Sequence, residues 1–175
     1  YVFELFSDDY KRLINQTSVR ARMAPLPEGD KANACWDGIV APDGKFYPAQ
    51  DITRAEFAAI AARFDAYGNT EGSFFSDIAG HWAEREIIIA ANNGWVEGYN
   101  GLFRPDDYIT RAEAMTLVNR VLHRLPETEH DLLEYMVIWP DNMDVNAWYY
   151  LAVQEATNSH DYVRKTDPVF ETWTE

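Results

Sequence analysis

Apolar residues recur at helical spacing in several stretches of the chain. One stripe consists of Phe57, Ile60, Ala61 and Phe64. A longer stripe consists of Ala114, Leu117, Val118, Val121, Leu122 and Leu125. Each stripe predicts an amphipathic helix with one face on a core. Another helix is predicted from His81 to about Asn93, with Gly94 as its C-terminal cap, and a fourth from Trp148 to Asn158.

Two of these helices follow nearly identical segments. Residues 44–56 read GKFYPAQDITRAE, and residues 101–113 read GLFRPDDYITRAE without a gap. A repeated segment of this kind is one supersecondary unit, which buries its apolar face only against its neighbours. The predicted architecture is therefore mainly α, with helix-loop-helix repeats that share one core.

A third, diverged copy follows the second. Trp139–Asp141 matches Phe75–Asp77, and the helix from Trp148 matches the helix that begins near Trp82. Residues 172–175, Thr-Trp-Thr-Glu, are interpreted as a degenerate helix start with tryptophan in place of arginine. The predicted repeats are residues 1–68, whose first half is degenerate or incomplete, residues 69–126 and residues 127–175.

The helix starts combine a structural motif with an unexpected cation. Thr53 with Glu56, and Thr110 with Glu113, have the Thr-x-x-Glu spacing of a capping box, in which each side chain bonds the other residue's amide. Arg54 and Arg111 occupy the first helical position, where a positive charge opposes the helix dipole. A surface salt bridge could explain one such arginine, but its recurrence favours an anionic ligand.

The second repeat resembles the S-layer homology domain. The matching residues are Phe75, Asp77, Trp82, Gly98, Tyr99, Gly101, Phe103, Pro105 and the segment Ile109–Glu113. The resemblance covers roughly residues 36–175. It implies three tandem repeats in one pseudo-threefold, mostly helical domain. It also implies an extracellular module, on a bacterial cell wall or S-layer, that binds secondary cell-wall polysaccharide, often pyruvylated.

The resemblance locates the ligand between adjacent repeats, at the arginine of each helix start and the loop before it. The candidate ligand-binding residues are Arg54, Arg111, Asp77, Trp82, Gly98, Asp141 and Trp148. Several have structural alternatives. Trp82 and Trp148 could pack in the core, and Asp77 and Asp141 could cap turns. Gly98 could supply a backbone conformation closed to other residues.

Composition narrows the function further. The net charge of −14 argues against nucleic acid, which is bound through many basic contacts. Cys35, the single cysteine, excludes an internal disulfide framework, and no apolar run has the length of a membrane helix. The histidines His81, His123, His130 and His160 show no metal-ligand spacing. No cofactor, metal or catalytic activity is expected.

The sequence therefore predicts a non-covalent cell-surface anchor that binds an acidic wall polysaccharide. The alternative is a structural or protein-interaction module that keeps the scaffold but has partly lost the glycan site. The diverged third copy keeps this alternative open, and self-association is compatible with either function.

Overall fold

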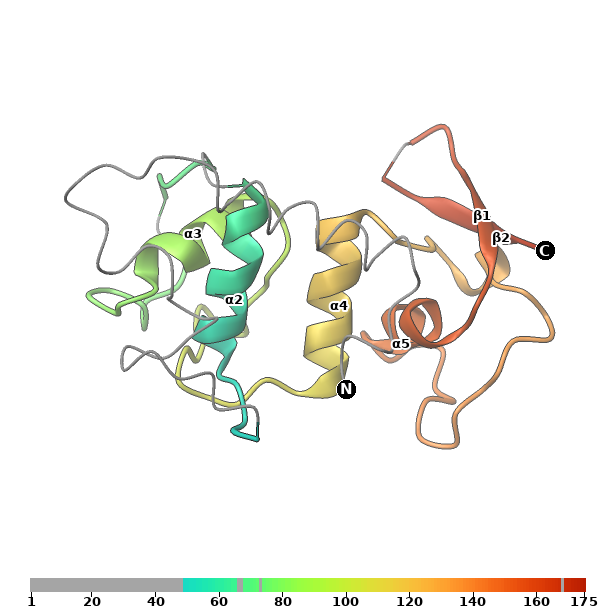
Figure 1. Ribbon diagram of the computed structural model, residues 1–175, viewed down its shortest axis with the longest axis horizontal. Helices are drawn as coiled ribbons and strands as arrows, with labels where there is room; N and C mark the ends of the chain where they lie inside the picture. The colour runs from blue at the N-terminus through green and yellow to red at the C-terminus, as the bar shows by residue number, and fades with distance from the viewer. Residues whose placement is uncertain (1–48, 66–67, 73, 168) are drawn as a thin grey trace. The chain divides into compact units, whose positions relative to one another are not determined.

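The computed structural model describes residues 49–65, 68–72, 74–167 and 169–175. The predicted features before residue 49, including Cys35, lie outside these ranges. The elements in chain order are α2 (Arg54–Ala62), η2 (Arg63–Asp65), α3 (Glu84–Asn92), α4 (Arg111–Leu122), η3 (Glu129–Asp131), α5 (Tyr150–Thr157), β1 (Asp161–Arg164) and β2 (Glu171–Thr174) (Figure 1). All four helices predicted from the apolar pattern and the repeat are present.

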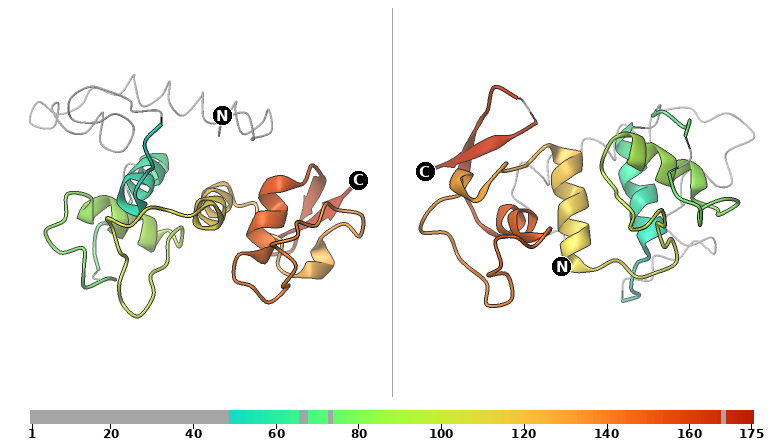
Figure 2. Two further views of the ribbon diagram at one scale, coloured as in Figure 1. Left: turned by 90° about the horizontal axis from the view of Figure 1, so that it is seen from below. Right: turned by 180° about the vertical axis from the view of Figure 1, so that it is seen from behind.

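The chain divides into two compact units, Tyr1–Ile109 and Thr110–Glu175. Within the first unit α2 packs on α3, and within the second α4 packs on α5. In each pair the helices cross one another (Figures 1 and 2). Each packed pair thus joins the second helix of one sequence repeat to the first helix of the next. The packing unit is offset by half a repeat from the boundaries that the sequence suggested.

Helix α2 buries a face of small residues. Ala55, Ala58, Ala59 and Ala62 are at most 4% exposed. Of the predicted stripe, Ala61 is buried, Phe57 and Ile60 are half-buried, and Phe64 is exposed. The prediction was therefore only partly right, because a pattern weighted by large side chains overlooks an alanine face. Small side chains on the buried face let a second helix approach closely. The larger side chains of Phe57 and Ile60 lie on the less buried face of α2.

Helix α3 ends as the sequence predicted. Gly94 has φ +69°, and the amide of Trp95 reaches back to the carbonyl of Ala90. This left-handed residue after the last helical turn confirms the glycine cap. The helix begins at Glu84, three residues later than predicted, because the chain from Ile78 to Ala83 forms turns. In those turns the amide of Ala83 donates to Nδ1 of His81.

Residues 172–175 do not begin a helix. They lie in and beside strand β2, which pairs antiparallel with β1. Asp161 is opposite Thr174 at one end of the pair, and Arg164 is opposite Glu171 at the other. The interpretation of this segment as a degenerate helix start was wrong. Burial alternates along β2, with Glu171 and Trp173 inside, and threonine and tryptophan favour strands. Trp173 packs with Leu132 and Tyr150 in the core of this unit.

We expect Gly98→Ala to lower the free energy of unfolding by about 1–3 kcal/mol. A Cβ atom at this position would lie 2.3 Å from the carbonyl oxygen of Leu102 and 2.5 Å from the ring of Phe75. Gly94→Ala is a control, because its left-handed backbone is unfavourable but the space beside it is open; it should cost about 1 kcal/mol. Chemical denaturation measures both, and an equal or smaller loss for Gly98→Ala would contradict the steric argument.

Candidate functional site

Both predicted helix starts have complete capping boxes. Oγ1 of Thr53 accepts from the amide of Glu56 at 3.2 Å, and the Glu56 carboxylate accepts from the amide of Thr53 at 2.8 Å. In the second copy the same two bonds join Thr110 and Glu113 at 3.2 and 2.9 Å. Local sequence therefore sets the same backbone at both sites, and it places an arginine at the same first helical position.

The side chain of Arg54 is buried beneath a loop of its own unit. The residue is 7% exposed, and its Nε donates to the carbonyl of Phe103 at 2.8 Å. Its Nη2 lies 3.5 Å from the carbonyl of Glu97, and the guanidinium stands 4.9 Å from the centre of the Phe103 ring. Arg54 therefore fastens the loop of residues 97–107 to the start of α2.

Backbone bonds reinforce this junction. The amides of Arg54 and Ala55 donate to the carbonyls of Asp107 and Pro105 at 2.8 and 2.9 Å. Two amides at the start of α2, which would otherwise be available to an anion, are thus bonded to the loop. The first copy of the motif is covered by the loop that follows α3.

The half-buried side chain of Asp77 bonds the backbone of the same loop. Its two carboxylate oxygens accept from the amides of Phe103 and Arg104 at 2.8 and 2.7 Å. Burial opposes its charge, but these amide hydrogen bonds outweigh the burial and lower the pKa of Asp77. Of the two roles considered for Asp77, the geometry supports the structural one, because the loop amides engage both oxygens.

Arg111 stands in a different environment. It is exposed, and within the described residues no hydrogen bond or ion pair engages its guanidinium. In the second unit the hairpin that follows α5 contacts the opposite end of α4, where the amide of Glu171 donates to the carbonyl of Leu125. The two arginines have the same sequence context, yet one is buried under a loop and the other is an exposed cation at a helix N-terminus.

The candidate aromatic residues lie at the surface. Trp82 is 52% exposed and Trp148 is 64% exposed, so neither is a core residue of the described structure. Tyr99, in the loop that Arg54 holds, is also exposed. Asp141 is exposed too, whereas Gly98 lies against the Leu102 carbonyl and the Phe75 ring of its own unit. The structure brings Arg54, Asp77 and Gly98 together around the loop of residues 97–107.

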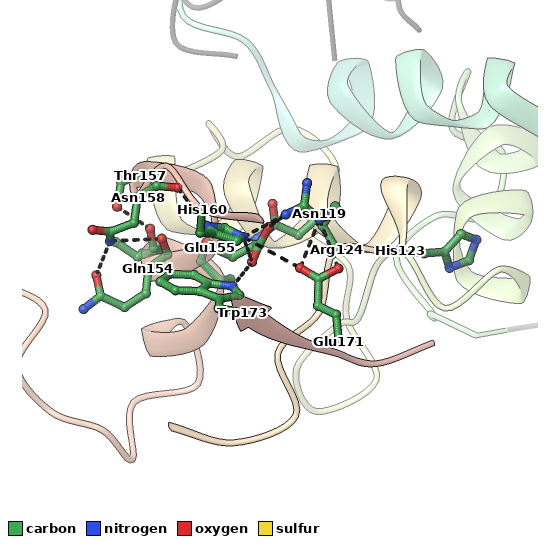
Figure 3. A network of polar contacts seen from close by, with 12 residues as sticks. Asn119, His123, Arg124, Gln154, Glu155, Thr157, Asn158, His160, Glu171 and Trp173 are labelled. Carbon is green, nitrogen blue, oxygen red and sulfur yellow. Dashed lines mark hydrogen bonds and ion pairs between the residues drawn. The ribbon is translucent and has the colours of Figure 1, made fainter. Parts of the chain in front are cut away.

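A buried ionic network in the second unit was not predicted. It consists of Arg124, Glu155, His160 and Glu171 (Figure 3). Ligand atoms of Glu155, His160 and Glu171 lie within 4.8 Å of one another, a spacing that would suit a metal. The guanidinium of Arg124 contacts all three, at 2.9 Å from Glu155, 3.0 Å from Glu171 and 2.7 Å from His160. An arginine therefore supplies the positive charge between these carboxylates.

Comparison with known proteins identifies the motif. The sequence profile of the S-layer homology domain matches residues 38–58 and 74–115. The chain is 37% identical over 128 residues to the cellulosome-anchoring protein of Acetivibrio thermocellus, which covers 69% of this chain and 27% of that protein. It is 33% identical over 135 residues to cell surface glycoprotein 1 of the same organism, covering 70% of this chain and 6% of that protein.

An S-layer protein of Bacillus licheniformis is 34% identical over 87 residues, which cover 46% of this chain and 10% of that protein. The chain spans at most 27% of the length of each of these relatives. The chain carries S-layer homology sequence, and the resemblance recognised from its motifs is confirmed. These similarities support a role in cell-surface anchoring. Among the described residues, no helix has the length and apolar character needed to cross a membrane.

Proposed function

We propose that this chain holds its parent protein on the bacterial cell wall by binding an acidic, pyruvylated secondary cell-wall polysaccharide. The observation that carries the proposal is the exposed guanidinium of Arg111 at the start of a twelve-residue capped helix. A helix N-terminus and an arginine both favour a negative ligand, and a carboxylate accepts two parallel bonds from a guanidinium.

Recognition on this chain would be local. The net charge of −14 repels an anionic polymer at long range, so binding depends on contacts at short distance. Exposed indoles at Trp82 and Trp148 offer flat apolar faces on which sugar rings can stack. The pseudo-threefold arrangement of three repeats, with a ligand between neighbouring repeats, remains a proposal that rests on the family resemblance. The proposed function includes no catalytic role.

One alternative has structural support of its own. Arg54 is already bonded to loop carbonyls, and the third copy ends in a strand where a degenerate helix start, with tryptophan in place of arginine, was predicted. A module with these features could act as a structural or protein-interaction unit that has partly lost its glycan site. The alternative predicts no dependence of wall binding on the secondary polymer.

We expect Arg111→Ala to weaken binding to the wall polymer about tenfold or more, since a charge-assisted hydrogen bond is worth roughly 1.5–3 kcal/mol. The assay is co-sedimentation with purified sacculi, with and without chemical removal of the secondary polymer. Arg85→Ala is the charge-matched control, because Arg85 is exposed on α3 and pairs only weakly with Glu86 at 3.4 Å.

Arg85→Ala should bind as the parent does, and stripped sacculi should bind neither protein. Equal pelleting of the parent chain with stripped sacculi would reject polymer binding and favour the interaction module. Normal polymer binding by Arg111→Ala would instead remove only the assignment of this residue to the site.

A further inference from the structure

The buried network of the second unit joins a hairpin to two helices (Figure 3). Arg124 follows α4, and Glu155 lies in α5. His160 and Glu171 belong to the hairpin segment, defined here as residues 160–174. The side chains of His160, Glu155 and Glu171 are at most 3% exposed, and that of Arg124 is 15% exposed. The pairs His160–Glu155 and Glu171–Arg124 therefore connect the hairpin segment to the helices through buried charges.

The Nε2 atom of His160 lies between two groups with opposite requirements. It lies 3.2 Å from Oε2 of Glu155 and 2.7 Å from Nη2 of Arg124. The ionised carboxylate of Glu155 accepts hydrogen bonds and cannot donate one, whereas the guanidinium of Arg124 donates hydrogen bonds and cannot accept one. Nδ1 of the same ring lies 3.0 Å from the carbonyl of Asn158. A doubly protonated ring can donate to both Glu155 and Asn158. A neutral ring with its proton on Nδ1 can accept from Arg124 but no longer binds Glu155.

The surroundings favour the charged ring. The titratable groups that face this junction are Glu155 from α5, Glu171 from β2, Arg124 after α4 and, at the rim, Arg164 from β1, which lies 3.2 Å from Glu171. Trp173 stacks on the imidazole with ring centres 3.8 Å apart, and its indole N–H donates to Glu155 at 2.7 Å. Two carboxylates and an indole face thus stabilise a positive imidazole, while Arg124 opposes it.

We propose that His160 is a proton-dependent clasp, which holds the hairpin segment against α4 and α5 at neutral pH and releases it in alkaline solution. The clasp acts on the segment that contains most of residues 172–175, which the sequence had suggested as a degenerate helix start. When the ring loses its proton, the two buried carboxylates keep Arg124 and the partly exposed Arg164 as cations, and the bond from His160 to Glu155 in α5 is lost, so that the indole N–H of Trp173 is left as the donor from the hairpin segment to Glu155.

The direction of the pH effect follows from the pKa of His160. Burial opposes its charge, but the carboxylates of Glu155 at 3.2 Å and Glu171 at 3.9 Å outweigh the burial and raise the pKa of His160 to about 9. The ordinary pKa of an imidazole is about 6.5. A group whose pKa is raised on folding stabilises the folded state fully below its unfolded pKa and loses that contribution as the pH rises through the folded value. Docking of the hairpin should therefore weaken between about pH 6.5 and pH 9 and be weakest above this range.

Two measurements on the full chain test the clasp. Histidine NMR with ring-labelled protein should show one imidazole that titrates near pH 9. Amide hydrogen exchange, corrected for intrinsic chemistry, should show protection of the β1–β2 ladder falling on the order of a hundredfold from pH 7 to pH 10. The amides of α3, in the other unit, should keep their protection, which separates release of the hairpin from global unfolding.

Variants assign the effect to the junction. His160→Gln should lower ladder protection at pH 7 to about the alkaline level and abolish the pH dependence. Glu155→Gln should move two midpoints toward lower pH, that of the His160 titration followed by NMR and that of the fall in ladder protection. This variant keeps the test decisive if His160→Gln folds poorly. His130→Gln is the control, because the His130 side chain is 88% exposed, and it should leave the midpoint unchanged. Constant ladder protection while His160 loses its proton would overturn the proposal, as would a His160 midpoint near 6.5.

Discussion

Replacing Glu171 with alanine is expected to lower the free energy of unfolding by about 3–5 kcal/mol, because it leaves buried cations without their partner. The Glu171 side chain is fully buried, lies 3.0 Å from Nε of Arg124 and 3.2 Å from Nη1 of Arg164, and faces His160 at 3.9 Å. Burial works against its charge, yet His160 and Arg124 outweigh the burial and lower the pKa of Glu171. Its contribution should therefore be present at neutral pH and be lost as the pH falls through this lowered pKa.

Chemical denaturation at pH 7 measures this loss, and Glu129→Ala is the matched control. Glu129 belongs to the same unit, but its side chain is half exposed, so removing it should change the free energy of unfolding by about 0.5 kcal/mol or less. A loss for Glu171→Ala as small as that for Glu129→Ala would mean that water or a shifted side chain replaces the carboxylate. The network would then not hold the hairpin.

Local chemistry explains which parts of this fold could be predicted. The capping boxes at Thr53 and Thr110 and the glycine cap at Gly94 involve residues within five positions of one another, so a short segment determines them. The repeat then identified the helices that begin near Trp82 and Trp148. These features depend on spacing along the chain, which a single sequence contains.

The parts that were missed depend on distant pairing. Strand β2 exists because it pairs with β1 and because Glu171 finds Arg124, a residue 47 positions earlier. Nothing in the four residues at 172–175 distinguishes this outcome from a diverged helix start, since Thr-x-x-Glu fits both. The burial of His160 likewise arises from α5, β2 and the end of α4 together, so its sequence neighbours contain no signal of it.

The candidate site shows the same limit within one motif. The segment Ile-Thr-Arg-Ala-Glu predicts the same backbone twice, and the two cap residues have nearly the same dihedral angles, φ −80° and ψ 163° at Thr53 and φ −78° and ψ 159° at Thr110. The two arginines differ because the loop of residues 97–107 lies over Arg54, while in the second unit a hairpin contacts the other end of α4. Sequence identity at the helix start therefore predicts geometry but not accessibility, and accessibility decides which arginine can meet a polymer.

Replacing Arg54 with alanine is expected to lower the free energy of unfolding by about 2–4 kcal/mol, whereas Arg111→Ala should leave it within about 0.5 kcal/mol or raise it slightly. Without Arg54 the carbonyl of Phe103 loses a charge-assisted bond in a buried place, and the loop loses its side-chain attachment to α2. Arg111 has no such attachment among the described residues, and its removal takes a cation from a helix start.

Arg54→Lys separates charge from geometry. A lysine keeps the positive charge, but its single ammonium lacks the planar fork that reaches the Phe103 and Glu97 carbonyls together. It should therefore recover only part of the stability that alanine loses. Denaturation curves of the three variants, with polymer affinity measured on the same samples, test this assignment. If Arg54→Ala proves as stable as the parent while Arg111→Ala is strongly destabilised, the roles of the two arginines are reversed, and the polymer site belongs at the loop of residues 97–107.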